Sequence, residues 1–183
     1  MCVVERGSGV CSSVPSRLRR QLPPATPLLV LGLGSNTLVR DGGVRGTVIV
    51  MHNPGAALAV TDGLIYADAG LASPKLARFA AMRGCAEAEF LAGVPGTIGG
   101  ALAMNAGCYG GETWRHVARV ETPHRRGGFS VTTPADYALR SPTVRPPPRS
   151  ARPGVYPPAW VRLPASHPPP APPPLRDRRG PAR

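Results

Sequence analysis

The stretch that decides the fold is Leu91–Glu112, with the sequence LAGVPGTIGGALAMNAGCYGGE. It is dense in glycine and carries almost no charge. Glycine lets a backbone turn sharply or lie against a bulky partner, because no Cβ stands in the way. Pro95-Gly96 and Gly99-Gly100 predict turns, and Ala101–Met104 predicts a short apolar element between glycine-rich segments. The stretch therefore predicts a long loop with much of its backbone exposed.

A second glycine loop lies upstream, in Leu31–Leu38, which reads LGLGSNTL. Two such loops in one small domain suggest a phosphate-bearing cofactor, because bare backbone N–H groups form anion-binding nests. Ser35 and Asn36 add hydroxyl and amide groups that suit a pyrophosphate. The Rossmann fingerprint is incomplete, since Thr37 stands where its third glycine would be. Plain tight turns remain the alternative for this loop.

Two polar residues of the downstream loop, Thr97 and Asn105, lie in an apolar setting. Ligand pockets place their specific hydrogen bonds at such positions. The alternative is a glycine-rich loop that packs closely on a sheet.

The flanking sequence predicts a mixed α+β domain. Expected strands are Leu28–Leu31, Val48–Met51, Leu64–Ala69, Val117–Glu121 and Phe129–Thr132, with turns at Asp41–Gly43, Asp62-Gly63 and Arg126–Gly128. The clearest helix has Ser73 as N-cap, Pro74 at its first position, Leu76, Phe79 and Ala80 as its buried stripe, and Gly84 as its left-handed stop.

Three segments follow from these patterns. Residues 1–27 are irregular, residues 28–140 carry the regular elements, and residues 141–183 are rich in proline and arginine. Proline lacks the backbone N–H and blocks both helices and central strands. We therefore expect the last segment to be disordered and unable to continue a packed domain.

The chain has a net charge of +12, with 22 Lys+Arg against 10 Asp+Glu. Beyond residue 140, eight arginines face the single acidic residue Asp177, whereas Leu28–Arg140 is nearly balanced. The basic excess is thus mainly a property of the last segment. No aromatic residues alternate with its arginines, so nucleic-acid binding through this segment is the weaker alternative.

The remaining reactive residues give little sign of chemistry. Cys2, Cys11, Cys85 and Cys108 form no CxxC pair and have no zinc-site spacing, so we expect free thiols in a reducing compartment and no metal site. The four histidines are scattered, and we expect them to be non-catalytic. No apolar run is long enough for a membrane span, and the N-terminus does not read as a signal peptide. These features predict a cytoplasmic protein.

Read together, two motifs are far more specific than either alone. GLGSNTLVRDGGVRGTVI (Gly32–Ile49) followed by AGVPGTIGGALAMNAGCYGGE (Ala92–Glu112) resembles the UDP-N-acetylenolpyruvoylglucosamine reductases. These flavoenzymes, also called UDP-N-acetylmuramate dehydrogenases, act in bacterial peptidoglycan precursor synthesis and so in cell-wall biogenesis, cell shape and cell division. The resemblance covers roughly Leu22–Arg140 and includes the order, the spacing and the helix between the motifs.

The resemblance implies an incomplete FAD-binding domain of the p-cresol-methylhydroxylase type, in which two α+β lobes hold FAD between them. NADPH would serve as reductant, and the substrate would be UDP-N-acetylglucosamine enolpyruvate, reduced to UDP-N-acetylmuramate. Arg140, after Tyr137-Ala138-Leu139, would be the catalytic residue that absorbs developing negative charge. The cofactor would contact Gly32, Gly34, Ser35, Asn36, Thr37 and Leu38 in the first loop, and Gly93, Pro95, Gly96, Thr97, Gly99, Gly100, Asn105, Gly107, Tyr109 and Gly110 in the second.

The sequence also departs from this family. Leu139 replaces the usual tyrosine, and no residue can be matched to the serine general acid or the assisting glutamate. The abrupt change after Arg140 is what an out-of-frame reading of GC-rich DNA would give, and the N-terminal segment can share that origin. The alternative functions are an FAD-binding remnant without turnover and a nucleic-acid binder that uses its basic tail.

Overall fold

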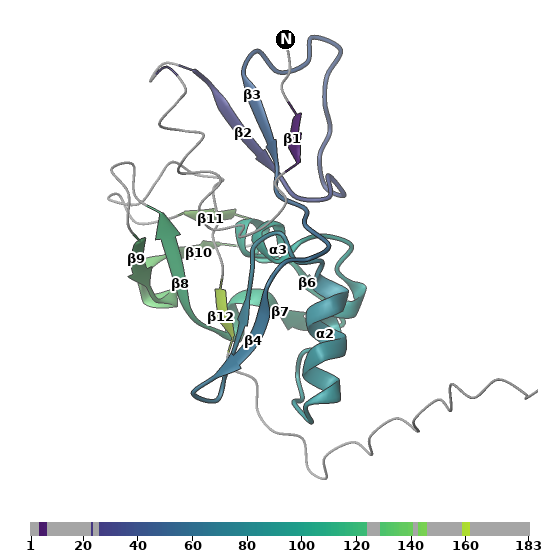
Figure 1. Cartoon of the computed structure of the whole chain (residues 1–183), viewed down its shortest axis with the longest axis vertical. Helices are drawn as coiled ribbons and strands as arrows, with labels where there is room; N and C mark the ends of the chain where they lie inside the picture. The colour runs from purple at the N-terminus through teal and green to yellow at the C-terminus, as the bar shows by residue number, and fades with distance from the viewer. Residues whose placement is uncertain are drawn as a thin grey trace, which may run out of the picture.

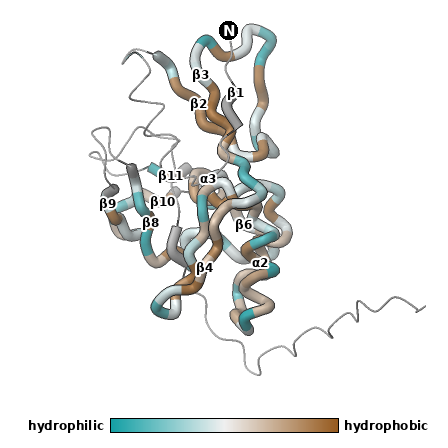
Figure 2. The backbone as a smooth tube through the Cα atoms, in the orientation of Figure 1, coloured by the Kyte–Doolittle hydropathy of each residue, from teal (hydrophilic) through white to brown (hydrophobic). Residues whose placement is uncertain are grey.

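A small parallel sheet forms the first of two lobes (Figure 1). The computed structural model describes residues 4–6, 23, 26–123, 129–140, 143–145 and 159–161. In this sheet β1 (Val4–Arg6) and β2 (Leu28–Leu31) flank β3 (Thr47–Val50), and both run parallel to it. Ile49 of β3 forms a small core with Met51 and Ala69, and Leu28 and Val30 of β2 pack against it. Figure 2 shows the apolar character of β2 and β3.

A five-stranded antiparallel sheet is the centre of the second lobe. Its order is β4 (Leu58–Thr61), β5 (Leu64–Ala67), β12 (Ala159–Val161), β8 (Val117–Pro123) and β9 (Phe129–Thr132). Asp62 and Gly63, which join β4 to β5, both have positive φ, at 52° and 72°. Two-residue hairpin turns with positive φ at both residues match the right-handed twist of the flanking strands.

The remaining elements of the second lobe are short except for one helix. They are α2 (Ser73–Met82), η1 (Glu89–Gly93), α3 (Ile98–Met104), β6 (Gly107–Cys108), β7 (Gly111–Glu112), η2 (Thr113–Arg115), η3 (Pro134–Asp136), β10 (Ala138–Arg140) and β11 (Thr143–Arg145). The main core joins α2, α3 and the large sheet, and its most deeply buried side chains include Leu76, Ile98, Leu102 and Val120.

Helix α2 confirms most of its predicted pattern. Leu76 and Ala80 are fully buried, and Gly84 has the left-handed φ of 68° that ends the helix. Phe79 is only partly buried, and the Arg83 guanidinium lies 4.5 Å from the centre of its ring.

The prediction that Ser73 caps this helix is wrong. The N-cap is Ala72, and Ser73 is the first helical residue, with a buried hydroxyl that has no partner among the described residues. Ala72 forms a β-bridge with Thr97, and this pairing holds it in the extended conformation of an N-cap. Tertiary pairing, rather than side-chain capping, therefore sets where the helix begins.

All five predicted strands are present. β2 and β9 match residue for residue, β3 is shifted by one residue, and β5 and β8 each differ by two residues at the C-terminal end. The turn predicted at Arg126–Gly128 lies outside the described residues.

Two predictions about the terminal segments need correction. β1 lies in residues 1–27, where we expected no regular element, and β11 and β12 lie in residues 141–183, which we expected not to continue a packed domain. The three-residue segments of β11 and β12 contain no proline, so each keeps the N–H groups that a ladder requires. β11 pairs with its neighbour β10 in a hairpin, whereas β12 pairs with β5 and β8, which are distant in the sequence.

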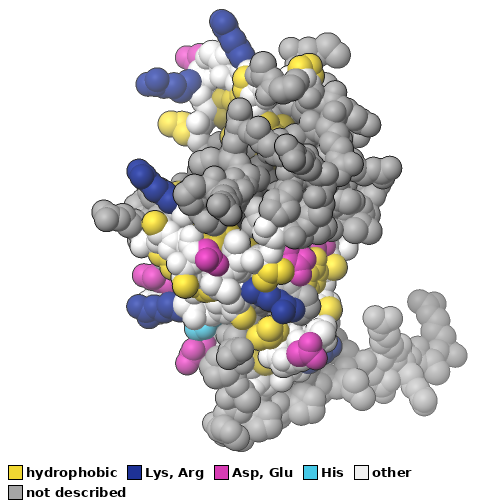
Figure 3. Space-filling model, turned by 90° about the vertical axis from the view of Figure 1, so that its left-hand side faces the viewer, with side chains coloured by type: hydrophobic (Ala, Val, Ile, Leu, Met, Phe, Trp, Pro, Cys, Tyr) yellow, Lys and Arg dark blue, Asp and Glu magenta, His cyan; other side chains and the backbone are white. Residues whose placement is uncertain are grey.

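Charge on the described surface is mixed. On the face shown in Figure 3, Lys and Arg side chains alternate with Asp and Glu. This agrees with the near balance expected for Leu28–Arg140.

Candidate cofactor site

The two glycine loops predicted from the sequence contact each other where the lobes meet. A Cβ added to Gly32 would collide with the Oγ1 of Thr97, and one added to Gly96 would lie 3.5 Å from the Oγ of Ser35. Gly32 follows β2 in the first lobe, whereas Thr97 precedes α3 in the second. Only a residue without a side chain at position 32 allows this approach.

Backbone hydrogen bonds fix the second loop in place. Ser73 N–H donates to the Gly96 carbonyl at 2.9 Å, and Ile98 N–H donates to the Leu71 carbonyl at 2.8 Å. A third bond, also 2.8 Å, runs from Gly99 N–H to the carbonyl of Ala69. The segment that begins α3 is thus paired with the segment that begins α2.

The first loop, by contrast, leaves its backbone open. Thr37 N–H bonds to the Gly34 carbonyl at 3.2 Å, but the N–H groups of Ser35 and Asn36 donate to no acceptor within the part of the chain that the structure describes. Gly34 has a positive φ of 76°, and Leu38 is 93% exposed. The loop therefore presents bare N–H groups, which suit phosphate oxygens.

Thr97 and Asn105 use their side chains within the protein. Thr97 caps α3, and its Oγ1 accepts from Gly100 N–H at 3.3 Å. Asn105 ends α3 with a φ of 46°; its Oδ1 accepts from Trp114 N–H at 3.1 Å, and its Nδ2 donates to Glu112 Oε2 at 3.2 Å. Direct contact of either residue with a cofactor stays a prediction.

At two further positions of the second loop, neighbouring atoms leave no room for a side chain, which explains why glycine stands there. A Cβ on Gly93 would come within 2.6 Å of the Cys108 Sγ, and one on Gly107 would collide with the Gly111 carbonyl. Tyr109, by contrast, is 90% exposed and has a positive φ of 51°. Its ring is therefore available to a ligand.

The candidate catalytic residue, Arg140, ends β10 and pairs with Thr143 of β11. Val144 of β11 is buried in the core that also contains Leu102 of α3. The hairpin that carries Arg140 therefore packs against α3, the helix within the second glycine loop (Figure 1).

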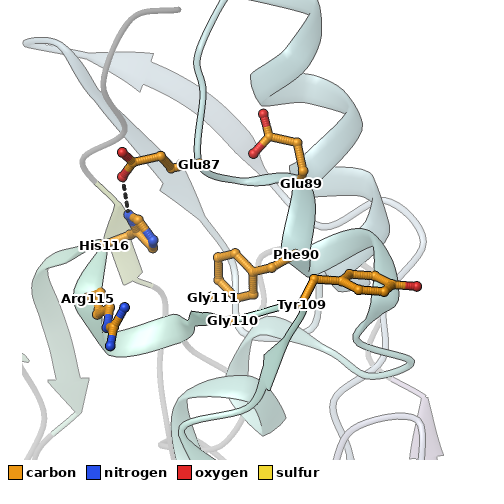
Figure 4. A pocket seen from close by; sticks show the side chains of 8 residues that line it. All are labelled: Glu87, Glu89, Phe90, Tyr109, Gly110, Gly111, Arg115 and His116. Carbon is orange, nitrogen blue, oxygen red and sulfur yellow. Dashed lines mark ion pairs between the residues drawn. The ribbon is translucent and has the colours of Figure 1, made fainter.

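A pocket in the second lobe was not predicted from the sequence (Figure 4). It has a volume of about 640 Å³ and is lined by Glu87, Glu89, Phe90, Tyr109, Gly110, Gly111, Arg115 and His116. Only Tyr109 and Gly110 belonged to the predicted site. Apart from Gly111 at the start of β7, the others lie on a short loop, on the 3-10 turns η1 and η2 or directly after η2, for which the sequence has no periodic signal.

The described residues contain no group of three or more His, Cys, Asp or Glu side chains that could hold a metal ion. Cys85 and Cys108 are free thiols, as expected, whereas Cys2 and Cys11 lie outside the described residues. In the described part of the chain, no helix combines the length and the apolar character that a membrane crossing requires.

Comparison with known proteins shows to which family the chain belongs. A family described as the FAD binding domain matches residues 24–129, which include both glycine loops. The chain belongs to the FAD-binding domain family.

The relatives of this FAD-binding domain carry one name. The chain is 53% identical over 122 residues to the UDP-N-acetylenolpyruvoylglucosamine reductase of Nitrosomonas eutropha, covering 64% of the chain and 37% of that protein. It is 56% identical over 124 residues to the reductase of the same name from Nitrosospira multiformis, covering 66% of the chain and 36% of that protein. The chain thus spans little more than a third of the length of these relatives.

A solved structure agrees with these matches. The structure of the UDP-N-acetylenolpyruvylglucosamine reductase from Thermus caldophilus superposes with a TM-score of 0.64 and 32% identity. The match covers 81% of the chain and 52% of that protein. The predicted resemblance and the α+β fold of this FAD-binding type are thereby confirmed.

The residues present fit FAD at the contact between the lobes. The first loop offers the unpaired N–H groups of Ser35 and Asn36 beside their polar side chains. Gly32 and Gly96 let the second loop approach that site closely. A diphosphate needs both features, namely donors and room beside the backbone.

Proposed function

We propose that this chain forms the FAD-binding part of a reductase that uses NADPH to convert UDP-N-acetylglucosamine enolpyruvate to UDP-N-acetylmuramate. The observation that carries the proposal is the contact between the two glycine loops, at Gly32 and Thr97. The name shared by the relatives supports the choice of reaction. A role in peptidoglycan precursor synthesis, and so in cell shape and division, follows, with a cytoplasmic location.

The first loop would bind the diphosphate of the cofactor. Its donors are the N–H groups of Ser35 and Asn36, which point to no protein acceptor in the described part of the chain. The exposed Leu38 would lose contact with water when the cofactor binds. When bound, FAD supplies hydride-transfer chemistry between a nicotinamide and an acceptor.

The second loop would support the cofactor along its length. Thr97 and Asn105 hold the two ends of α3, and their internal hydrogen bonds keep the loop in one conformation. A preorganised site loses less free energy on binding, because its groups are already ordered. Tyr109 would contribute an exposed ring near the reacting groups.

Arg140 would stabilise the charge that develops on the substrate. Reduction of the enolpyruvyl C=C bond adds a hydride to one carbon and a proton to the other. Negative charge builds up next to the substrate carboxylate before the proton arrives, and a fixed cation stabilises it. The proton donor is assigned to no residue of this chain.

The first test of the proposal is FAD binding by the full chain. We expect FAD fluorescence to change on titration with protein, and we expect Gly34→Ala to weaken binding. Its left-handed φ of 76° strains any L side chain, although no atom lies within 4 Å of the added Cβ. Gly42→Ala is the matched control, because that Cβ also meets open space and no positive φ opposes it. Equal FAD affinity in the two variants would contradict the role of the first loop.

The second test separates turnover from binding alone. Because the proton donor is assigned to no residue of this chain, we expect the chain alone to bind FAD without oxidation of NADPH that depends on the enolpyruvyl UDP-sugar. Substrate-dependent oxidation that Arg140→Gln abolishes, with FAD affinity unchanged, would instead show that the chain by itself completes the reaction.

A further inference from the structure

The pocket in Figure 4 shares Tyr109 and Gly110 with the proposed cofactor site, and its six other lining residues lie outside that site. Its walls are the loop before η1, the start of η1, the β6–β7 connection and η2. No residue of the first glycine loop lines it. Its volume of about 640 Å³ lies within the ~300–1,000 Å³ of small-molecule sites.

The floor of the pocket is aromatic. The Phe90 and His116 rings stack with centroids 5.6 Å apart and an interplanar angle of 29°. Phe90 is anchored from below, because a Cβ on Gly111 would lie only 2.6 Å from the Phe90 Cγ. A rigid aromatic floor favours a ligand with an apolar body.

Charges of both signs border this floor. Glu89 and Arg115 are exposed, and neither has an ion pair or side-chain hydrogen bond within the described part of the chain. Glu87 Oε2 lies 3.7 Å from His116 Nδ1, with side-chain exposures of 63% and 12% for the glutamate and the histidine. Figure 4 shows Glu89 and Arg115 on different sides of the Phe90 ring.

These charged side chains determine which ligand charges the pocket can accept. A simple cation would be attracted by Glu87 and Glu89 but repelled by Arg115, and a simple anion would meet the reverse. A polyphosphate is the least suitable ligand, because two carboxylates border the pocket. A molecule with an ammonium group at one end and a carboxylate at the other can place the ammonium near the two glutamates and the carboxylate near Arg115.

We propose that this pocket binds a small zwitterion, an amino acid or dipeptide with an apolar side chain. The ligand ammonium lies against Glu89, with Glu87 beside it. Arg115 receives the ligand carboxylate, for which its planar guanidinium is suited. The apolar side chain covers Phe90. The groups that would bind this ligand, Glu89, Arg115 and Phe90, lie outside the proposed FAD site, so this inference does not rest on the proposed function.

The test titrates the full chain, without added FAD, with L-phenylalanine and with leucyl-phenylalanine, and follows binding by ligand-observed NMR. N-acetyl-L-phenylalanine lacks the ammonium, and L-phenylalanine amide lacks the carboxylate. We expect saturable binding of both zwitterions and weaker binding of both analogues. Glu89→Gln and Arg115→Gln should each weaken binding about fivefold, the effect of losing one exposed ion pair of ~1 kcal/mol.

The matched control is Arg78→Gln on the exposed face of α2, which removes a cation outside the pocket. Unchanged affinity in this control, together with the losses in the two pocket variants, supports the site. The proposal is overturned if neither zwitterion binds, if both analogues bind as well as L-phenylalanine, or if Glu89→Gln and Arg115→Gln behave like the control.

Discussion

Gly32 and Thr97 contact each other across the two lobes, and the Thr97 side chain fills the space in which a Cβ of Gly32 would lie. Each residue belongs to one of the two glycine loops. Thr97 is 1% exposed and is held by its role as the N-cap of α3. Because Thr97 cannot move away without breaking this cap, the absence of a side chain at position 32 sets the distance between the loops.

The first prediction follows from this contact. Gly32→Ala places a methyl group against the Thr97 hydroxyl, and we expect a loss of ~1–3 kcal/mol in the free energy of unfolding, as for an overpacked core. FAD affinity should fall as well, because the loops are pushed apart. Thermal melts and FAD titrations measure the two effects.

The control for this contact is Gly42→Ala, where an added Cβ meets no atom within 4 Å. We expect that variant to melt within a degree or two of the wild type. A Gly32→Ala variant that is as stable as this control would contradict the contact.

The sequence predicted the loops because their signal is local. Glycine density and the order of the two motifs identify Gly32–Leu38 and Gly93–Gly111 without reference to the fold, and both lie within the matched family region. The strands β2, β3, β5, β8 and β9 were also predictable, since short apolar runs between turns mark them. The close approach of Thr97 to Gly32 could not be predicted, because the two residues are distant in the sequence.

Other elements depend on contacts that no local pattern records. Ala72 caps α2 because it pairs with Thr97, and β12 exists because β5 and β8 accept it on its two edges. The pocket combines Glu89 of η1 with Arg115 of η2. None of these pairings follows from periodicity or turn chemistry.

A second prediction concerns Asn105, the left-handed end of α3. Asn105→Ala removes the hydrogen bonds to Trp114 N–H and Glu112 and also places alanine at a φ of 46°. Asn105→Gly removes the same bonds without backbone strain. We expect alanine to cost about 1 kcal/mol more than glycine, as left-handed conformations do for residues with a Cβ. Urea unfolding measures the difference.

Asn53 provides the comparison for this pair. It also bonds to the backbone, through Oδ1 to Gly55 N–H at 2.9 Å, but its φ is not positive. There alanine should be at least as stable as glycine. If alanine is at least as stable as glycine at position 105 as well, the left-handed conformation of Asn105 stores no strain.

The third prediction is a pH dependence. Asp136 Oδ2 accepts from the Thr133 N–H at 2.7 Å and from its hydroxyl at 3.0 Å. These bonds, the backbone one first, hold the pKa of Asp136 below its ordinary value of 3.8. Because the folded pKa is lowered, this contribution to stability is present above pH 3.8 and is lost as the pH falls through the folded pKa.

Two variants test this contribution. Asp136→Asn should be less stable than the wild type at neutral pH, and the gap in melting temperature should close as the pH falls below about 4. Thr133→Val keeps the backbone donor and removes the hydroxyl, so NMR titration should find a partial rise in the pKa of Asp136. A stability gap that stays constant from pH 7 to pH 2 would exclude this assignment.

The last prediction concerns β12, which lies beyond the segment that the sequence marked as folded. Ala159 and Trp160 pair with Ala67 and Tyr66 of β5 on one edge, and with Val120 and Arg119 of β8 on the other. Truncation after Arg145 keeps β11 but removes β12, which leaves the facing edges of β5 and β8 unpaired, whereas truncation after Val161 keeps both strands. Each lost ladder bond costs ~0.5–1.5 kcal/mol net, so we expect the shorter chain to lose about 3 kcal/mol and to aggregate through its open edges. In the full chain Val161→Pro should weaken the same sheet, because proline removes a ladder donor. Chemical unfolding and light scattering measure both effects, and equal stability of the two truncated chains would mean that β12 adds nothing to the sheet.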